Sequence, residues 1–121
     1  MNSEKPIKFI DKNKNSLLKD LQTLIHQPSI SAKNEGIKEC SVLVSKMLKK
    51  SGIKSEILRL GKNAAPLVYG EVKSKNNPNT TLLFYNHYDV QPVEPLELWD
   101  DPPFSGKIIG NKIFGRGASD D

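Results

Sequence analysis

Residues 81–92 of this chain read TLLFYNHYDVQP, an apolar run of strand length that stops at His87 and Asp89. The consecutive apolar and aromatic side chains of residues 81–85 predict a strand buried on both faces, which places it centrally in a helix-covered sheet. Open α/β sheets bind their ligands at the carboxyl ends of such strands. This stretch therefore predicts an α/β fold and also the place of a site.

A second stretch, residues 115–121, reads GRGASDD and is a glycine-bounded turn that delivers two adjacent carboxylates. A histidine binds a metal ion through one ring nitrogen while a nearby carboxylate holds the other N–H. His87 and Asp89 are spaced for that arrangement, and Asp120 offers a hard oxygen ligand that can bind one cation or bridge two. Together the two stretches predict a metal centre.

The same residues also allow simpler interpretations. A histidine and an aspartate two positions apart are often a surface hydrogen-bonded pair, and the turn around Arg116 could bind a phosphate or a carboxylate. Ser119 next to Asp120 could be a nucleophile, although the Gly-x-Ser-x-Gly motif that exposes such a serine is missing. These alternatives stay open at the level of the single motif.

Three blocks of sequence in this order resemble one family of enzymes. Residues 86–92 (NHYDVQP), 99–104 (WDDPPF) and 115–121 (GRGASDD) look like the co-catalytic zinc metallopeptidases. That family includes carnosinase-like dipeptidases, acetylornithine deacetylase and succinyl-diaminopimelate desuccinylase. The amino-acid sequences of the first two blocks resemble those of the dipeptidases more than those of the deacylases. The resemblance implies that residues 1–121 are the N-terminal part of a truncated zinc-exopeptidase-like catalytic domain, an α/β fold with a helix-covered mixed sheet.

The resemblance also implies roles for individual residues. His87 would ligate one zinc ion, Asp89 would orient His87, and Asp120 would bridge two zinc ions, with cobalt or manganese as replacements. Asp121 would be the scaffold next to the bridging ligand, through a cis peptide bond that costs about 3–4 kcal/mol. The implied reaction is hydrolysis of the amide bond of a dipeptide or N-acyl amino acid by metal-activated water.

The chain also departs from the family pattern. The remaining ligands, the glutamate base and the dimerisation domain of the family have no counterpart up to residue 121. The other histidine, His26, lies in the last turn of a helical pattern and is not expected to be a ligand. The alternative to an enzyme is therefore a non-catalytic fragment, or half of a split enzyme that needs a partner chain. A full-length member of the family could be a homodimer.

The first half of the chain predicts two helices. Residues 1–14 are polar and predict a loosely ordered lead-in, with Asn15 or Ser16 capping a first helix that Pro28 ends. A second helix is predicted from about residue 35 to residue 51, and Gly52 follows it where a left-handed C-terminal residue belongs.

The second half predicts strands and one long irregular segment. Two strands are expected over residues 54–60 and 67–72, and a hairpin is expected over residues 107–114 around Gly110-Asn111. Between them, residues 91–104 are rich in proline and acidic side chains. The four carboxylates of this segment predict a solvated rim over packed aromatic side chains rather than extra ligands: Glu94, Glu97, Asp100 and Asp101, over Trp99 and Phe104.

Composition excludes several function classes. The chain is 36% hydrophobic and 26% charged, as in ordinary globular proteins, and has no apolar run near the ~20 residues of a membrane helix. Residues 1–75 hold 15 Lys and Arg against 7 Asp and Glu, whereas residues 76–121 hold 3 against 7. Cation binding suits the acidic half, and the scattered lysines of the basic half predict a solvated surface, with no nucleic acid or membrane as partner.

The single cysteine, Cys40, excludes an internal disulfide and is predicted to be a small buried hydrophobic residue. The polar N-terminus lacks the apolar core of a signal peptide. Both observations predict a cytoplasmic protein. The resemblance implies that its substrate is a small peptide or an acyl amino acid.

Overall fold

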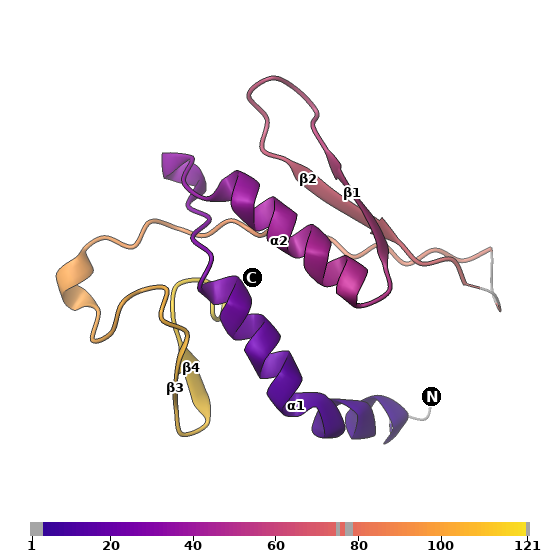
Figure 1. The fold of residues 1–121 in the computed structure, drawn as a ribbon, viewed down its shortest axis with the longest axis horizontal. Helices are drawn as coiled ribbons and strands as arrows, with labels where there is room; N and C mark the ends of the chain where they lie inside the picture. Colours follow the sequence, from indigo (N-terminus) through magenta and orange to yellow (C-terminus); the bar gives the residue numbers. More distant parts are fainter. Residues whose placement is uncertain (1–3, 75, 77–78, 121) are drawn as a thin grey trace.

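The computed structural model describes residues 4–74, 76 and 79–120, as two helices, two strand pairs and long connecting segments (Figure 1). The elements run in the order α1 (Glu4–Ile25), η1 (Ser31–Lys33), α2 (Ile37–Lys50), β1 (Lys54–Leu58), β2 (Leu67–Glu71), η2 (Leu96–Leu98), β3 (Lys107–Ile109) and β4 (Lys112–Phe114), where η marks a 3-10 helix. The α/β fold class predicted from the sequence is confirmed.

Helix α1 corrects the prediction for the N-terminal residues. The helix begins at Glu4, well before the predicted caps Asn15 and Ser16, so the described part of the predicted lead-in is helical. Pro6 is compatible with this because the N–H groups of a first helical turn have no intrahelical partner to lose. Phe9 is nevertheless 63% exposed. The first turns of α1 are thus helical without being buried in this structure.

Helix α2 ends as its sequence predicts. Gly52 adopts a left-handed conformation with φ of +80°. Its N–H donates to the carbonyl of Lys49 (3.0 Å), and the next N–H, of Ile53, reaches back to the carbonyl of Leu48 (2.9 Å). These are the two hydrogen bonds of a Schellman motif, which satisfies carbonyls that the helix end leaves without partners. The predicted second helix is confirmed.

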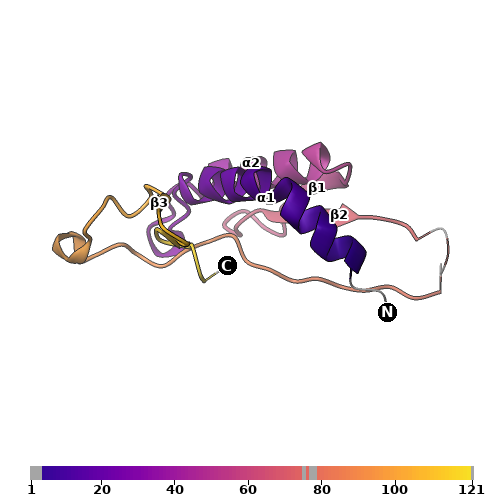
Figure 2. The ribbon, with the colours of Figure 1, turned by 90° about the horizontal axis from the view of Figure 1, so that it is seen from below.

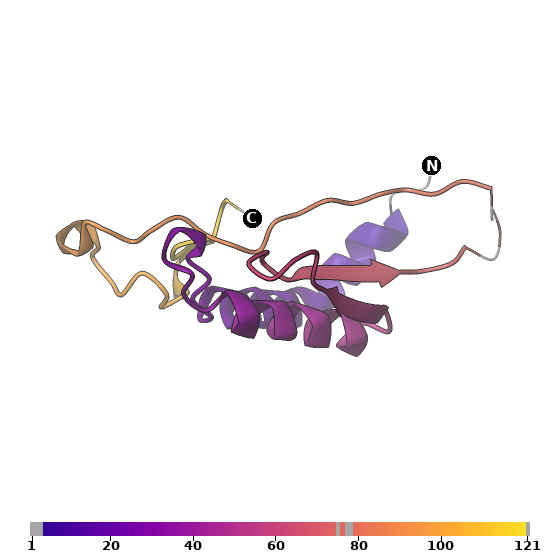
Figure 3. The same cartoon turned by 90° about the horizontal axis from the view of Figure 1, so that it is seen from above.

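Strands β1 and β2 pair antiparallel, from Lys54 opposite Glu71 to Leu58 opposite Leu67. Helix α2 packs on one face of this pair (Figure 3). The contact includes a buried hydrogen bond between the hydroxyls of Ser45 and Ser55, at 2.8 Å. A helix layer on an antiparallel strand pair is the part of the predicted helix-covered sheet that the described residues contain.

The predicted third strand is wrong for this structure. Residues 81–85 belong to neither of the two strand pairs, and Leu83 and Tyr85 are 89% and 87% exposed. Figures 2 and 3 show the segment as an extended trace that runs apart from α2. A strand exists through hydrogen bonds to a neighbouring strand, and among the described residues nothing pairs with this segment. Its apolar character therefore does not translate into burial here.

The predicted hairpin is confirmed by strands β3 and β4, which pair from Lys107 opposite Phe114 to Ile109 opposite Lys112. The start of this hairpin is tied to the end of α1. The amide of Gln22 donates to the carbonyl of Gly106, and His26 Nε2 bonds the carbonyl of Ser105, both at 2.8 Å. His26 thus has a structural partner on the hairpin side of the fold.

The small core lies where the end of α1, the turn after it, the start of α2 and residues 88–93 meet. Its hydrophobic members are Ile25, Ile30, Ile37, Cys40 and Val93. No helix among the described residues is long and apolar enough to cross a membrane.

Candidate metal centre

His87 and Asp89 lie side by side at the end of the extended segment. His87 Nδ1 is 2.9 Å from the backbone carbonyl oxygen of Asp89 and 3.3 Å from its Oδ1. Because a carbonyl oxygen only accepts hydrogen bonds, Nδ1 must carry a proton, and in the neutral ring the lone pair is then on Nε2. Asp89 therefore selects the tautomer whose Nε2 can bind a cation.

Asp120 faces that same nitrogen. Its Oδ1 lies 3.5 Å from His87 Nε2, which is longer than a good hydrogen bond. A lone pair and a carboxylate oxygen facing each other repel unless a cation, either a proton or a metal ion, lies between them. Two ligands of one tetrahedral zinc ion, each about 2.0–2.1 Å from the metal, are separated by roughly 3.3 Å. The donor set and its spacing thus fit a zinc ion.

The predicted ligands His87 and Asp120 are therefore neighbours, but the described residues contain only part of the predicted centre. Among residues 4–74, 76 and 79–120, no group of three or more His, Cys, Asp or Glu side chains could hold a metal ion together. Asp121, with its predicted cis peptide bond, lies outside the described residues. The part of the chain that the structure describes brings together two of the predicted ligands, His87 and Asp120, and the residue predicted to orient His87, Asp89.

The segment that carries His87 and Asp89 is anchored on the residues between and after them. The thiol of Cys40 donates to the carbonyl of Tyr88 at 3.6 Å. The N–H of Val90 donates to the carbonyl of Ser29 at 2.9 Å, and Val90 forms a parallel bridge with Ile30. The turn after α1 and the start of α2 thus hold this segment in place.

The loop that carries Asp120 is anchored on the last residue of α1. Gly115 packs so closely that an added Cβ would lie 2.7 Å from Ile25 Cγ2. The N–H of Arg116 donates to the carbonyl of Pro103 at 2.7 Å, and its guanidinium lies 5.2 Å from the centre of the Trp99 ring. This cation–π contact joins the loop to the irregular segment before it.

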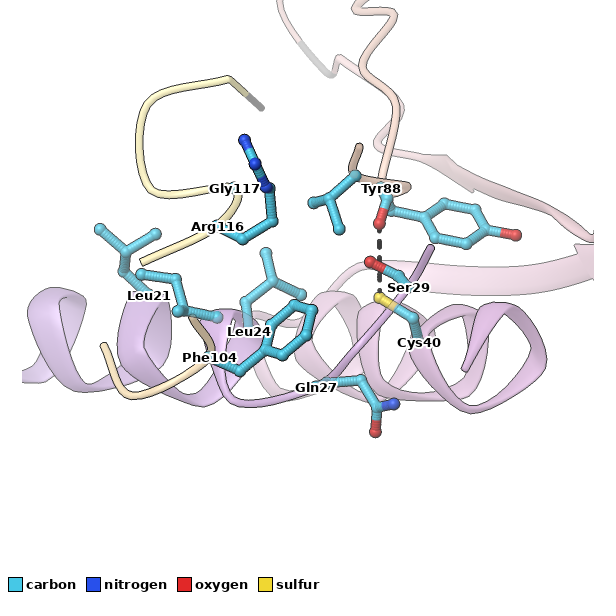
Figure 4. Close-up of a pocket in the computed structure, with 11 residues that line it drawn as sticks. Leu21, Leu24, Gln27, Ser29, Cys40, Tyr88, Phe104, Arg116 and Gly117 are labelled. Carbon is cyan, nitrogen blue, oxygen red and sulfur yellow. Dashed lines mark hydrogen bonds between the residues drawn. The ribbon is translucent and has the colours of Figure 1, made fainter. Parts of the chain in front are cut away.

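A small cavity separates the two anchored segments, and Figure 4 shows its lining side chains. Its volume is about 20 Å³, enough for one water molecule but not for a substrate. Arg116 lines it, and its Nε is buried without a hydrogen-bond partner among the described residues. Both predicted ligand segments therefore rest on the same small core, which couples their positions.

The predicted acidic rim is largely exposed, with two of its carboxylates paired to lysines. Glu94 is hydrogen-bonded to Lys33, which lowers the pKa of its carboxyl group, and Asp101 accepts from Lys107 at 2.8 Å. Trp99 Nε1 donates to the carbonyl of Val93 at 2.8 Å. The Trp99 side chain is thus packed against the segment, as predicted.

Sequence reasoning missed the anchors, above all Tyr88 and the pairing of His26 with Ser105. The signal for Tyr88 was present, because alternate residues of an extended chain point to opposite sides. When His87 and Asp89 face the site, the residue between them faces the protein.

The fold and the site define a class of protein: an α/β chain with a histidine–aspartate pair facing an aspartate that a second loop delivers. Comparison with known proteins agrees. Residues 83–121 match the model of peptidase family M20/M25/M40. Succinyl-diaminopimelate desuccinylases from Blochmanniella pennsylvanica and Blochmanniella floridana are each 36% identical over 108 residues, which is 89% and 88% of this chain.

A solved structure is also similar. An M20 family metallo-carboxypeptidase from Sulfolobus solfataricus matches with a TM-score of 0.74 and 40% identity over 83% of this chain. These matches make the chain similar to members of peptidase family M20/M25/M40, and residues 83–121 carry the match to the family model. The chain spans 27% of the length of the desuccinylases and 22% of the solved carboxypeptidase chain.

Proposed function

We propose that this chain supplies ligands to a two-zinc centre that hydrolyses the amide bond of a dipeptide or an N-acyl amino acid. The observation that carries the proposal is the 3.5 Å approach of His87 Nε2 to Asp120 Oδ1. A desuccinylase and a metallo-carboxypeptidase among the similar proteins support hydrolysis as the class of reaction.

Each residue has a distinct task in this proposal. His87 binds through Nε2, and Asp89 keeps the proton on Nδ1 and prevents the ring from rotating. Asp120, whose side chain is 85% exposed, has an accessible carboxylate that can bind on both oxygens. Bound zinc ions would supply Lewis acidity for the carbonyl and a lowered pKa for the attacking water.

A second candidate is a chain that binds metal weakly and does not catalyse by itself. It is favoured by the absence of a third ligand from the described residues. Two protein ligands leave the other coordination positions to water, to residues outside the described set or to a partner chain. In this case the chain would be one half of a centre.

Zinc binding and hydrolysis, measured on the same samples, test both candidates. We expect weak zinc binding by calorimetry that falls at least tenfold in His87→Ala and in Asp120→Asn. Glu97→Gln, which removes an exposed carboxylate in η2, is the matched control and should bind as the unchanged chain does. Zinc affinity that is the same in all four samples would rule out this centre.

Hydrolysis then tests whether the 121-residue chain can catalyse without a partner. We expect no zinc-dependent cleavage of dipeptides or succinyl amino acids above the blank for the 121-residue chain alone. Turnover that is lost in His87→Ala would instead show that the chain is a catalyst without a partner.

A further inference from the structure

The side chain of Tyr88, which lies between His87 and Asp89 in the sequence, points away from the candidate metal centre. Residues 81–87 are exposed, and Tyr88 is the first residue of this segment that is partly buried. In an extended chain His87 and Asp89 share one side and Tyr88 takes the opposite one. Figure 4 shows the Tyr88 ring directed away from the cavity that Arg116 lines.

Two hydrogen bonds hold residue 88. Its hydroxyl donates to the carbonyl of Pro66 at 2.5 Å, and its own carbonyl accepts from the Cys40 thiol. Pro66 is buried and directly precedes β2. Tyr88 is therefore fixed by its side chain to the sheet and by its backbone to helix α2, which packs on that sheet.

These two contacts of Tyr88 restrict rotation of the backbone at residues 87–89 about the axis of the extended segment. Residues 81–85 are exposed and belong to no strand pair, so no strand hydrogen bonds from them fix the rotation of the backbone about its own axis at residues 87–89. The Tyr88 hydroxyl lies at the far end of the ring, well away from the backbone axis. Fixing it therefore strongly restricts rotation of the backbone about that axis. The bond from Tyr88 to Pro66 thus sets the direction in which both neighbouring side chains point.

We infer that Tyr88 is a positioning residue whose hydroxyl, bound to the Pro66 carbonyl, holds His87 with Nδ1 on Asp89 and Nε2 toward Asp120. The importance of this for metal binding rests on the proposed function. The orientation of His87 does not, because it is defined by contacts within the chain itself.

The test is a nitrogen-15 NMR spectrum of the two histidine rings of the metal-free full chain, at a pH where the rings are neutral. In the unchanged chain, the His87 spectrum should show one dominant tautomer, protonated at Nδ1. In Tyr88→Phe, which loses only the hydroxyl, we expect the two His87 nitrogen resonances to move toward each other as the tautomers mix. His26 should not change and serves as the internal reference.

Tyr85→Phe is the matched control, because it removes the hydroxyl of an 87% exposed tyrosine in the same segment. It should leave the His87 resonances unchanged. Zinc titration of the same samples should show about a tenfold weaker affinity for Tyr88→Phe alone, as for other residues that orient a ligand.

Unchanged His87 resonances in Tyr88→Phe would overturn the inference. So would loss of the folded backbone spectrum, because the hydroxyl would then hold the fold rather than the direction of His87. A changed tautomer without any zinc binding in the unchanged chain would support the positioning role and reject the proposed function. The two can thus fail separately.

Discussion

At the scale of single residues, Gly115 shows how little freedom the Asp120 loop has. An added Cβ there would lie 2.7 Å from Ile25 Cγ2 and 3.2 Å from the carbonyl oxygen of Pro103. The first distance is shorter than real Cβ contacts allow, and the second neighbour is backbone, which moves at a higher cost than a side chain. The loop therefore needs glycine for space at this position.

We expect Gly115→Ala to destabilise the chain by about 1–3 kcal/mol, through overpacking against α1. Gly61→Ala is the matched control, because the closest atom to its added Cβ is Ala64 Cβ at 4.0 Å. It should be neutral or slightly stabilising. Urea unfolding of both variants measures the difference, and equal stability of the two would contradict the packing seen here.

The site residues could be selected from the sequence because their chemistry is local. A histidine, an aspartate two positions later and an aspartate in a glycine-bounded turn can be read without a structure. The partners that hold them could not. Cys40, Pro66 and Ser29 are far from residues 87–90 in sequence, and no local pattern predicts which backbone carbonyl a side chain will meet.

At the scale of elements, the end of α2 and the β3–β4 turn follow from residue type. Gly52 and Gly110 have φ of +80° and +59°, a conformation that L-residues with a Cβ rarely adopt. The start of α1 was missed because residues 4–14 are dominated by charged and polar side chains and their few apolar residues, such as Phe9, are exposed. Nothing in this stretch prevents a helix.

The segment 81–85 is the element whose sequence and structure disagree, and this can be measured. We expect its backbone amides to exchange with solvent nearly as fast as in an unfolded chain, because none of them is paired in a strand. The amides of β1 and β2 that face each other across the pair should be slower. Hydrogen exchange followed by NMR gives both rates.

Protection of residues 81–85 equal to that of β1 would contradict this expectation. It would show that the apolar run finds a strand partner in solution, through a second copy of the chain or another segment.

At the scale of the whole molecule, the burial of two acidic protons links stability to pH. Burial raises the pKa of the Cys40 thiol above its ordinary value of 9.0 and that of the Tyr88 hydroxyl above 10.0. As pH rises, the unfolded chain loses these protons first and is therefore favoured. The contribution of both groups is complete below about pH 9 and is lost as pH rises through their folded-state pKa values.

We expect the free energy of unfolding, measured with urea under reducing conditions, to fall between about pH 8.5 and pH 10.5. Cys40→Ala should show a shallower fall over that range, because it removes one of the two groups. The alanine variant will also start from a lower stability, since Cys40 is only 1% exposed. Parallel curves for the two proteins would mean that the thiol is not coupled to folding.

The opposite limb of the pH curve involves Glu94, whose pKa is lowered chiefly by its hydrogen bond to Lys33. Its small contribution is present above the ordinary carboxyl pKa and is lost as pH falls through the lowered value. Because both side chains are about half exposed, solvent screens this pair, and the alkaline limb should dominate.

By itself the sequence determined the fold class, the second helix, the positions of the first two strands, the hairpin and the residues with metal-binding chemistry. These follow from short-range rules: side-chain periodicity, the backbone freedom of glycine and the donor atoms of His and Asp. Only the tertiary structure decided that residues 81–85 stay unpaired, that His87 carries its proton on Nδ1, and that Tyr88 anchors the site. The strand and the anchor depend on groups distant in sequence, because a strand needs a partner strand and the Tyr88 hydroxyl needs the Pro66 carbonyl. The tautomer depends on a neighbour, the Asp89 carbonyl, but only the folded backbone brings that acceptor within reach of Nδ1.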